Sequence, residues 1–368
     1  MEDAFGRSAP FSVGIEEEFQ LLSAESYELV PRFDEVAGAA GDDRVRQELM
    51  TSVLEAATGI SGTVAEAVEE VRAIRTRLAA AAAERGSVIA SAGTHPFSRW
   101  EHQEITDSPR YRGVLEELGW VAERVAIFGL HVHVGLDDAD KAAAVATALR
   151  TWVPELLALS ANSPFWHGRD TGLASTRTQI FETMPRSGLP PRLDSFADFE
   201  ALAGRAVAAG FVREYTYLWW DVRPHPKLGT VELRACDAQT RVESVAGLAA
   251  LIQSLAATLA ARYEREGRLP AQPRTLVAEN KWRAARYGLA ATLVDLEHDT
   301  ERRATEAALE LVELAGPAAR RLGCTEQLAE LERVCERGGG AAEQRRIHED
   351  DGTLLAVAQW LAATTVGD

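Results

Sequence analysis

The chain has 368 residues, of which 46% are hydrophobic and 26% are charged. Its 39 basic and 56 acidic residues give a formal net charge of -17. This charge argues against nucleic acid or an anionic membrane as a partner, but not against a nucleotide held through a local metal site. Only three cysteines occur, and neither a secretory signal nor an apolar run of membrane-spanning length is visible, so we expect a soluble cytoplasmic protein.

The first predicted strand lies in FSVGIEEEFQLL, residues 11–22. Odd-numbered positions are mostly apolar, whereas Glu16, Glu18 and Gln20 share the opposite face. Glu17 falls in the apolar phase. It therefore needs a cationic or water partner, because an unpaired buried carboxylate is costly.

A helix is predicted over residues 63–85, where Thr63 and Glu66 fit a capping box. Strands are predicted next in SVIASAGTHPF and AIFGLHVHVGLDD. The second of these leads into a long helix over about 138–160, which we expect to bend at Pro154.

The segment 161–193 is rich in Ser, Pro, Gly and Thr and is too long for a simple connection, so we expect it to form part of a site. Two strands joined by a proline-containing turn follow it. The C-terminal part, 243–365, is predicted to be helical, with a flexible glycine-rich loop near residue 336 and helices at 243–265, 275–290, 296–315, 325–336 and 343–364. Because strands dominate residues 10–240, with helices between them, the pattern favours an α+β fold, which we interpret as a single catalytic domain over residues 1–368.

Three predicted strands each place polar side chains on one face within an apolar frame. The pairs are Glu16 with Glu18, His131 with His133, and Glu232 with Arg234. If the strands are neighbours, three carboxylates, two imidazoles and a guanidinium converge on one sheet surface. Such an oxygen-rich set suits Mg²⁺ or Mn²⁺. Each pair alone is typical of a half-solvated sheet face or an exposed ion pair, but their conjunction favours a site.

Two further arginines, Arg177 and Arg223, are candidates for binding a phosphate or carboxylate in bidentate fashion, with solvated loop arginines as the alternative. Cys236 is predicted to be a small packed thiol on the face of Glu232. The sequence contains no P-loop motif, no G-x-G-x-x-G and no G-x-S-x-G, so nucleotide folds built on these motifs and hydrolase elbows lose their usual support.

Several longer motifs are more specific: GIEEEFQL, AGTHPF, FGLHVHVG, SANSPFWHGRDTGLASTR, WWDVRPHPKLGTVELRACDAQT and ENKWRAARYG. They resemble the bacterial glutamate-cysteine ligase type 2 family, the YbdK-like carboxylate-amine ligases, from about residue 11 to the end. The resemblance implies a glutamine-synthetase-like catalytic fold, in which a curved, mainly antiparallel sheet has helices packed on its outer face. It also implies an enzyme that uses ATP and Mg²⁺, or Mn²⁺, to join a small-molecule carboxylate, commonly glutamate, to an amine through an acyl phosphate.

Carried over motif by motif, the resemblance implies five metal ligands: Glu16, Glu18, Glu55, His131 and Glu232. It places His133 and Arg234 near the nucleotide. The expected catalytic arginines, which neutralise developing charge, are Arg177, Arg223 and Arg234.

Two stretches depart from the family's usual motifs. In MTSVLEAATG, where the pattern favours neither helix nor strand, Leu54 and Ala56 beside Glu55 replace commoner residues. Arg186 and Ser187 alter a loop motif beside the expected substrate site. The amine therefore stays open. Two other functions also stay open, namely phosphoryl transfer without amide formation and a catalytically decayed nucleotide- or amino-acid-binding protein. A homodimer is compatible with the sequence.

Overall fold

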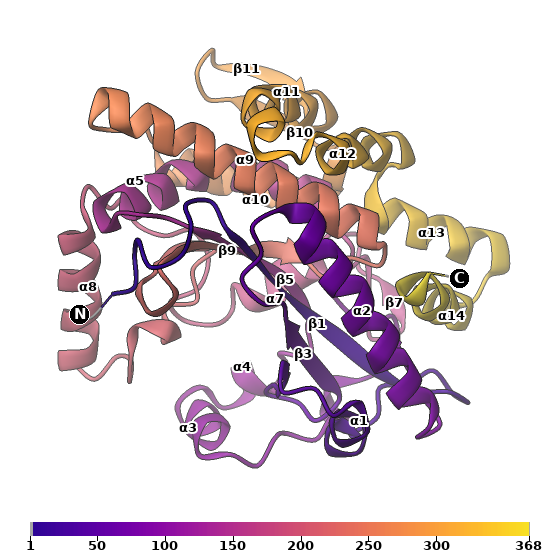
Figure 1. The fold of residues 1–368 in the computed structure, drawn as a ribbon. Coiled ribbons are helices and arrows are strands. Elements are labelled where there is room, and N and C mark those ends of the chain that lie inside the picture. Colours follow the sequence, from indigo (N-terminus) through magenta and orange to yellow (C-terminus); the bar gives the residue numbers. More distant parts are fainter. Residues whose placement is uncertain (1–2, 368) are drawn as a thin grey trace.

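The computed structural model describes residues 3–367, and its centre is a seven-stranded sheet in the order β2–β3–β1–β5–β9–β8, with β4 paired to β1 (Figure 1). All of its strand pairs are antiparallel. The strands are β1 (Val13–Ser23), β2 (Val45–Gln47), β3 (Val53–Ala57), β4 (Ser87–Ala90), β5 (Gly129–Gly135), β8 (Val222–His225) and β9 (Thr230–Asp237). Two small hairpins lie outside the sheet, β6–β7 (Phe165–Trp166 and Arg169–Asp170) and β10–β11 (Thr292–Asp295 and Thr300–Arg303).

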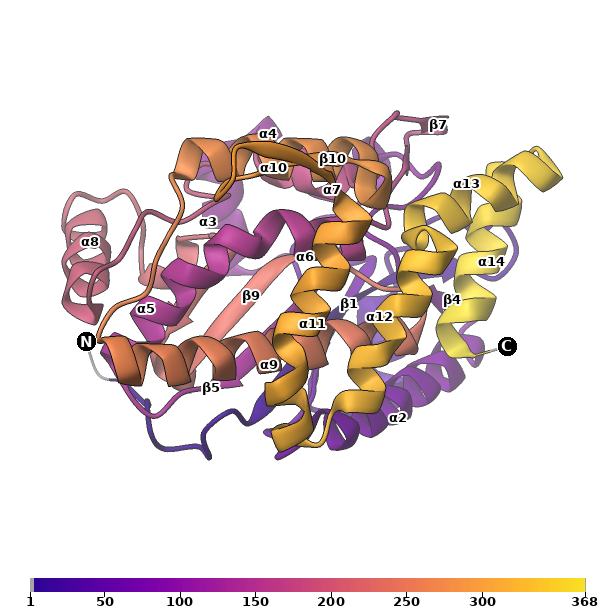
Figure 2. The ribbon, with the colours of Figure 1, turned by 90° about the horizontal axis from the view of Figure 1, so that it is seen from above.

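One face of the sheet is covered by helices. The central helix is α9 (Val242–Glu266), which contacts β1 and β5 and also the neighbouring helices α2 (Val64–Ala83) and α5 (Ala139–Leu149). A further layer, α11 (Ala304–Leu322) and α12 (Thr325–Arg337), packs on α9, as the view from above shows (Figure 2). The remaining helices on this side of the molecule are α6 (Val153–Ser160), α10 (Arg274–Tyr287), α13 (Gly339–Asp351) and α14 (Leu354–Val366).

The other side of the sheet is covered more sparsely. The short helices α3 (Pro109–Leu118) and α4 (Trp120–Glu123) lie on the side away from α9 (Figure 1). Beyond the sheet, α1 (Phe33–Ala40) packs on α2, whereas α7 (Thr176–Phe181) and α8 (Phe196–Ala208) belong to the connection between α6 and β8. This arrangement leaves room for a site on one sheet face and confirms the predicted α+β class.

Two helical segments are long and apolar enough to cross a membrane by composition alone, Ala139–Ser160 and Val242–Glu266. In the structure, 83% and 89% of their apolar windows are buried against the rest of the chain. They are therefore core helices of this fold. The first of them is interrupted by a 3-10 turn at Arg150–Trp152, just before Pro154 in the first turn of α6, as predicted from that proline.

The predicted helix at 296–315 is wrong in its first part. The residues before Ala304 form the β10–β11 hairpin. Its turn is set locally, because the Asp295 carboxylate accepts hydrogen bonds from the backbone N–H groups of Glu297 and His298, and Asp299 adopts a left-handed conformation with φ of 54°.

Two predictions near the C-terminus also need correction. The single helix expected over 343–364 is two helices, because Gly352 ends α13 in the left-handed conformation and the Thr353 hydroxyl caps α14. The glycine run is not a flexible loop, since only Gly338 separates α12 from α13. A side chain at Gly340 would collide with Asn162.

Glu17 has a partner inside the protein. Both side chains are buried, and Arg75 of α2 donates from Nε and Nη2 to the two Glu17 carboxylate oxygens at 3.1 and 2.6 Å. Arg75 also donates to the backbone carbonyls of Gln239, Thr240 and Thr365. The pair therefore joins β1 to the helical layer and to the last helix.

We predict that Arg75→Met lowers the free energy of unfolding by about 3–5 kcal/mol, because it leaves a buried carboxylate without its cation. The double variant Glu17→Gln/Arg75→Met should recover part of that loss. Chemical denaturation measures both. The matched control is Arg262→Met, which breaks the exposed α9 pair with Glu266 and should cost at most about 1 kcal/mol. Equal costs for Arg75→Met and Arg262→Met would contradict the assignment.

Candidate active site

The register of three strands decides which side chains meet. Glu16 of β1 lies directly opposite His131 of β5, and His133 of β5 lies opposite Glu232 of β9. Directly opposed residues of antiparallel strands point to the same face. The three polar faces expected from the sequence are therefore one continuous face.

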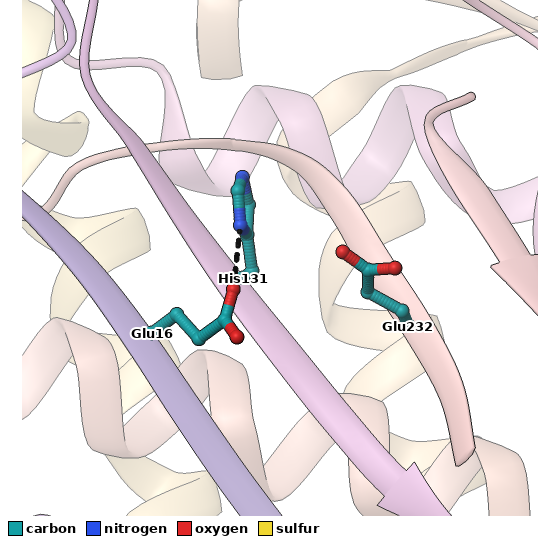
Figure 3. A group of neighbouring side chains, drawn as sticks. All are labelled: Glu16, His131 and Glu232. Carbon is teal, nitrogen blue, oxygen red and sulfur yellow. Dashed lines mark hydrogen bonds and ion pairs between the residues drawn. The ribbon is translucent and has the colours of Figure 1, made fainter. Parts of the chain in front are cut away.

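The first cluster consists of Glu16, His131 and Glu232, whose ligand atoms lie within 4.8 Å of one another. The His131 Nδ1 atom is 3.2 Å from the Glu16 carboxylate, and Figure 3 shows the three side chains pointing toward one another from neighbouring strands. His133 Nε2 lies 3.5 Å from Glu16 and 4.0 Å from Glu232, and it has no hydrogen-bond partner among the described residues.

The second cluster consists of Glu18, Glu48 and Glu55, again with carboxylate oxygens within 4.8 Å. Glu55 is on β3, a strand, directly opposite Glu18, which settles its local structure. Glu48 was not among the sequence candidates. It follows the three-residue strand β2, which is too short to show an alternation that would mark one face.

The two clusters differ in how their charges are balanced. Burial and the neighbouring Glu48 raise the pKa of Glu18 to about 7, and burial and Glu48 likewise raise the pKa of Glu55 well above its usual value. Burial also acts to raise the pKa of Glu16 and of Glu232. In the first case His133, and in the second Arg223 and Arg234, outweigh it and hold both pKa values well below the usual range.

The donor set fits divalent cations. The first cluster offers two carboxylates and an imidazole, and the second offers three carboxylates. Oxygen-rich sets of this kind suit Mg²⁺ and Mn²⁺. Burial and the nearby Arg234 lower the pKa of His131 to about 4, so its ring is neutral at pH 7, as a metal ligand must be.

Three arginines surround the carboxylates; Arg177 and Arg223 are buried and Arg234 is half-buried. Arg223 of β8 donates to Glu232 at 2.6 Å and to the carbonyls of Thr216 and Leu218, so its guanidinium is largely engaged by the protein. Arg234 of β9 also donates to Glu232. The Nε atoms of Arg234 and Arg177 have no hydrogen-bond partner among the described residues, which leaves both side chains with donors for a ligand.

Arg177, in the first turn of α7, lies above Gly129 of β5. A Cβ atom at position 129 would lie 2.3 Å from Arg177 Nη2. The N–H of Gly129 also donates to the Glu18 carboxylate. The glycine therefore makes room for the guanidinium beside the second cluster.

One facing prediction is wrong. Cys236 was expected on the face of Glu232, but it pairs with Leu130 and is buried in the hydrophobic core. The cause is a register shift between Leu130 and Val132, where β9 has one extra residue. Such a bulge reverses the facing of the residues beyond it.

Both clusters and the three arginines line one cavity of about 350 Å³. The cavity also contains His225, which sequence reasoning missed because it lies beside a proline turn at the end of β8. Its ring packs edge-on against His133, with centroids 5.6 Å apart. Burial is the main factor that lowers the pKa of His225 to about 4.

This fold is that of the glutamate–cysteine ligases. The chain matches the structure of a glutamate–cysteine ligase from Francisella tularensis in complex with AMP, with a TM-score of 0.69, 12% identity, and coverage of 100% of this chain and 90% of that one. It also matches PafA, the ligase of the prokaryotic ubiquitin-like protein Pup, with a TM-score of 0.53, 12% identity, and coverage of 96% and 72%.

The chain belongs to glutamate-cysteine ligase family 2, whose sequence profile matches residues 12–359. A protein of Rubrobacter xylanophilus provisionally named glutamate–cysteine ligase 2-3 is 47% identical over 99% of this chain and 100% of its own length. A Thermobifida fusca relative with a similar provisional name is 39% identical over 97% and 91%. The protein is therefore an ATP-dependent carboxylate–amine ligase.

We predict that Gly129→Ala lowers turnover at least roughly tenfold, because displacement of a positioned charge near the reacting groups costs rates of this order. The fold should survive, since the clash is with the flexible end of a side chain. Steady-state rates and thermal unfolding measure the two effects. Gly204→Ala on α8, where an added Cβ meets nothing within 4 Å, is the control. Unchanged turnover in Gly129→Ala would contradict a role for the position of Arg177.

Proposed function

We propose that the enzyme joins the carboxylate of glutamate to an amine, with ATP and Mg²⁺, or Mn²⁺ in its place, as cofactors. The observation that carries this proposal is the convergence of two carboxylate clusters and three arginines, two of them buried, in one cavity. A carboxylate is a poor electrophile. Transfer of the γ-phosphoryl group to it releases ADP and gives an acyl phosphate that an amine can attack.

The second step forms the amide. The amine nitrogen attacks the acyl carbon, the carbon–oxygen bond to the phosphoryl group breaks, and inorganic phosphate leaves while the nitrogen loses its proton to solvent. Both steps move negative charge between oxygen atoms, so the protein's task is mainly to position reactants and to stabilise charge. Buried arginines serve this purpose better than exposed ones, because the low dielectric strengthens their fields.

The proposed ligands of divalent cations are Glu16, His131 and Glu232 in one cluster and Glu18, Glu48 and Glu55 in the other. When bound, the cations would screen the phosphate charges. Arg177 and Arg234 would contact the phosphoryl or carboxylate oxygens, and His133 would lie by the nucleotide. Arg223 is best placed to act through Glu232, because its own donors are bound to Glu232 and to two backbone carbonyls.

We predict that Mg²⁺ raises the thermal unfolding midpoint of the wild-type protein, because binding to the native state alone stabilises it. Glu18→Gln should raise the midpoint without metal, since it relieves repulsion among the clustered carboxylates, and should weaken the response to Mg²⁺. Glu25→Gln, on the exposed turn after β1, is the control. If Mg²⁺ raised the unfolding midpoint of Glu18→Gln as much as that of the wild type, Glu18 would not be a metal ligand.

We predict ADP release from ATP only when both glutamate and a suitable amine are present, with the amide detected by mass spectrometry. Glu16→Gln and Glu232→Gln should abolish turnover while the chain stays folded. No product with any member of a broad amine panel would contradict the proposal. Amine-independent ADP release with a stable phosphorylated product would instead support a phosphotransferase, and nucleotide binding without turnover would indicate a decayed enzyme.

We further propose that the enzyme works in the cytoplasm on small-molecule substrates. Three unpaired cysteines, two of them buried, fit a reducing compartment. The strong net negative charge fits an enzyme that binds neither nucleic acid nor an anionic membrane surface.

A further inference from the structure

The cavity has two ends of different chemistry. Beside the first cluster its walls are polar, with His133, His225 and Thr216 among the lining residues. Two buried ring nitrogens at this end, His133 Nε2 and His225 Nδ1, have no hydrogen-bond partner among the described residues. This end therefore offers the hydrogen-bonding groups that a nucleotide requires.

Apolar side chains also line the cavity, next to charged ones. Five of them come from three separate segments, and we call them the apolar wall: Val114, Val125, Ile127, Phe181 and Met184. The wall lies beside the second cluster. This placement follows from Tyr111, one helical turn before Val114 on α3, because its hydroxyl donates to the carbonyl of Gln47, the residue before Glu48 of the second cluster.

Contacts outside the cavity hold the parts of the wall together. Arg186, two residues after Met184, donates to Glu117 of α3 at 2.7 Å, and its guanidinium packs on the ring of Trp219, another lining residue, at 5.5 Å. A second contact joins Arg124, beside Val125, to the hydroxyl of Thr183. These contacts link the three segments that form the apolar wall.

The segment that carries Phe181 and Met184 is also anchored by a buried lysine. Lys281 of α10 is 3% exposed and donates to Glu182 at 2.7 Å and to Asp221 at 2.6 Å. This buried cation therefore joins the residue after α7 to the residue before β8. The exposed Arg186–Glu117 pair is the weaker link, because such pairs contribute little to stability.

We propose that the apolar wall binds the substituent of the amine substrate, and that the enzyme selects amines with an aliphatic or aromatic group larger than the side chain of cysteine. The proposal rests on the ligase function given above. The nucleotide binds at the polar end, which leaves the apolar wall for the amine. A small thiol would cover only part of five bulky side chains, and each uncovered methylene forfeits binding in an apolar pocket.

The experiment compares amines with the full-length wild-type enzyme, ATP, Mg²⁺ and L-glutamate. We expect kcat/KM for leucine and phenylalanine to exceed that for cysteine and serine by roughly tenfold or more, since one methylene in an apolar pocket is worth about 10–200-fold. Equal or better turnover of cysteine would overturn this inference while leaving the ligase function intact. No product from any amine would overturn both.

Isosteric variants of two wall residues test whether the apolar wall binds the amine. Val114→Thr and Val125→Thr keep the side-chain shape but replace one methyl group with a hydroxyl, and we expect the amine KM to rise roughly tenfold with the KM values for ATP and glutamate unchanged. Val207→Thr, on an exposed part of α8, is the matched control. A rise in the KM for ATP in place of that for the amine would assign the wall to the nucleotide and overturn the proposal.

A third variant tests the wall without altering it. Arg186→Ala removes the link to Glu117 and the support behind Trp219, so we expect the preference for leucine over serine to narrow while turnover with saturating amine is kept. Arg192→Ala breaks an exposed pair with Asp194 in the same segment and is the control. An unchanged preference in Arg186→Ala, together with unchanged KM values in the threonine variants, would contradict the proposal.

Discussion

The pairing of Glu17 with Arg75 fixes the phase of the strand on which the site is built. Three successive glutamates cannot share one face of a strand, so one must enter the side that packs against the helices. Arg75 donates two hydrogen bonds to the Glu17 carboxylate and further hydrogen bonds to three backbone carbonyls. A slip of β1 by one residue would bury Glu16 and Glu18 and leave Arg75 without its carboxylate partner. The pair therefore specifies the register as well as the packing.

The charged face has an internal asymmetry that follows from where the arginines lie. Arg223 and Arg234 both bind Glu232 and hold its pKa low against the effect of burial, so the first cluster is partly neutralised by the protein itself. The second cluster has Glu48 in place of such cations, and burial together with this carboxylate raises the pKa of Glu18. Arg177, Arg234 and the Gly129 N–H oppose this rise in pKa without outweighing it. The protein therefore neutralises the second cluster less fully than the first, and external cations should affect the second cluster more strongly.

Period-two alternation was enough to predict which face of its own strand carries Glu16, His131 or Glu232, because each lies in a strand with an apolar frame. That these faces are one surface follows from the pairing of β1, β5 and β9. The alternation could not identify Glu48 or reveal that β9 contains a bulge. Glu48 depends on a three-residue strand, and the facing of Cys236 depends on one extra residue in the ladder. The hairpin before α11 was missed for a similar reason, since a side-chain turn at Asp295 overrides a helical pattern.

The helical layer and the loops have separate tasks in this enzyme. Strands held from behind by α2 and α9 set the charged floor, and their register leaves those side chains little freedom. The far wall comes from α3, the residues before β5 and the end of α7, joined through the exposed contact between Arg186 and Glu117. Because exposed ion pairs are cheap to lose, substitutions there can change the shape of the cavity without disturbing the carboxylates that the floor positions. On the proposed function, the strands therefore position the charged groups, and the segments of the far wall shape the part of the cavity that would hold the amine.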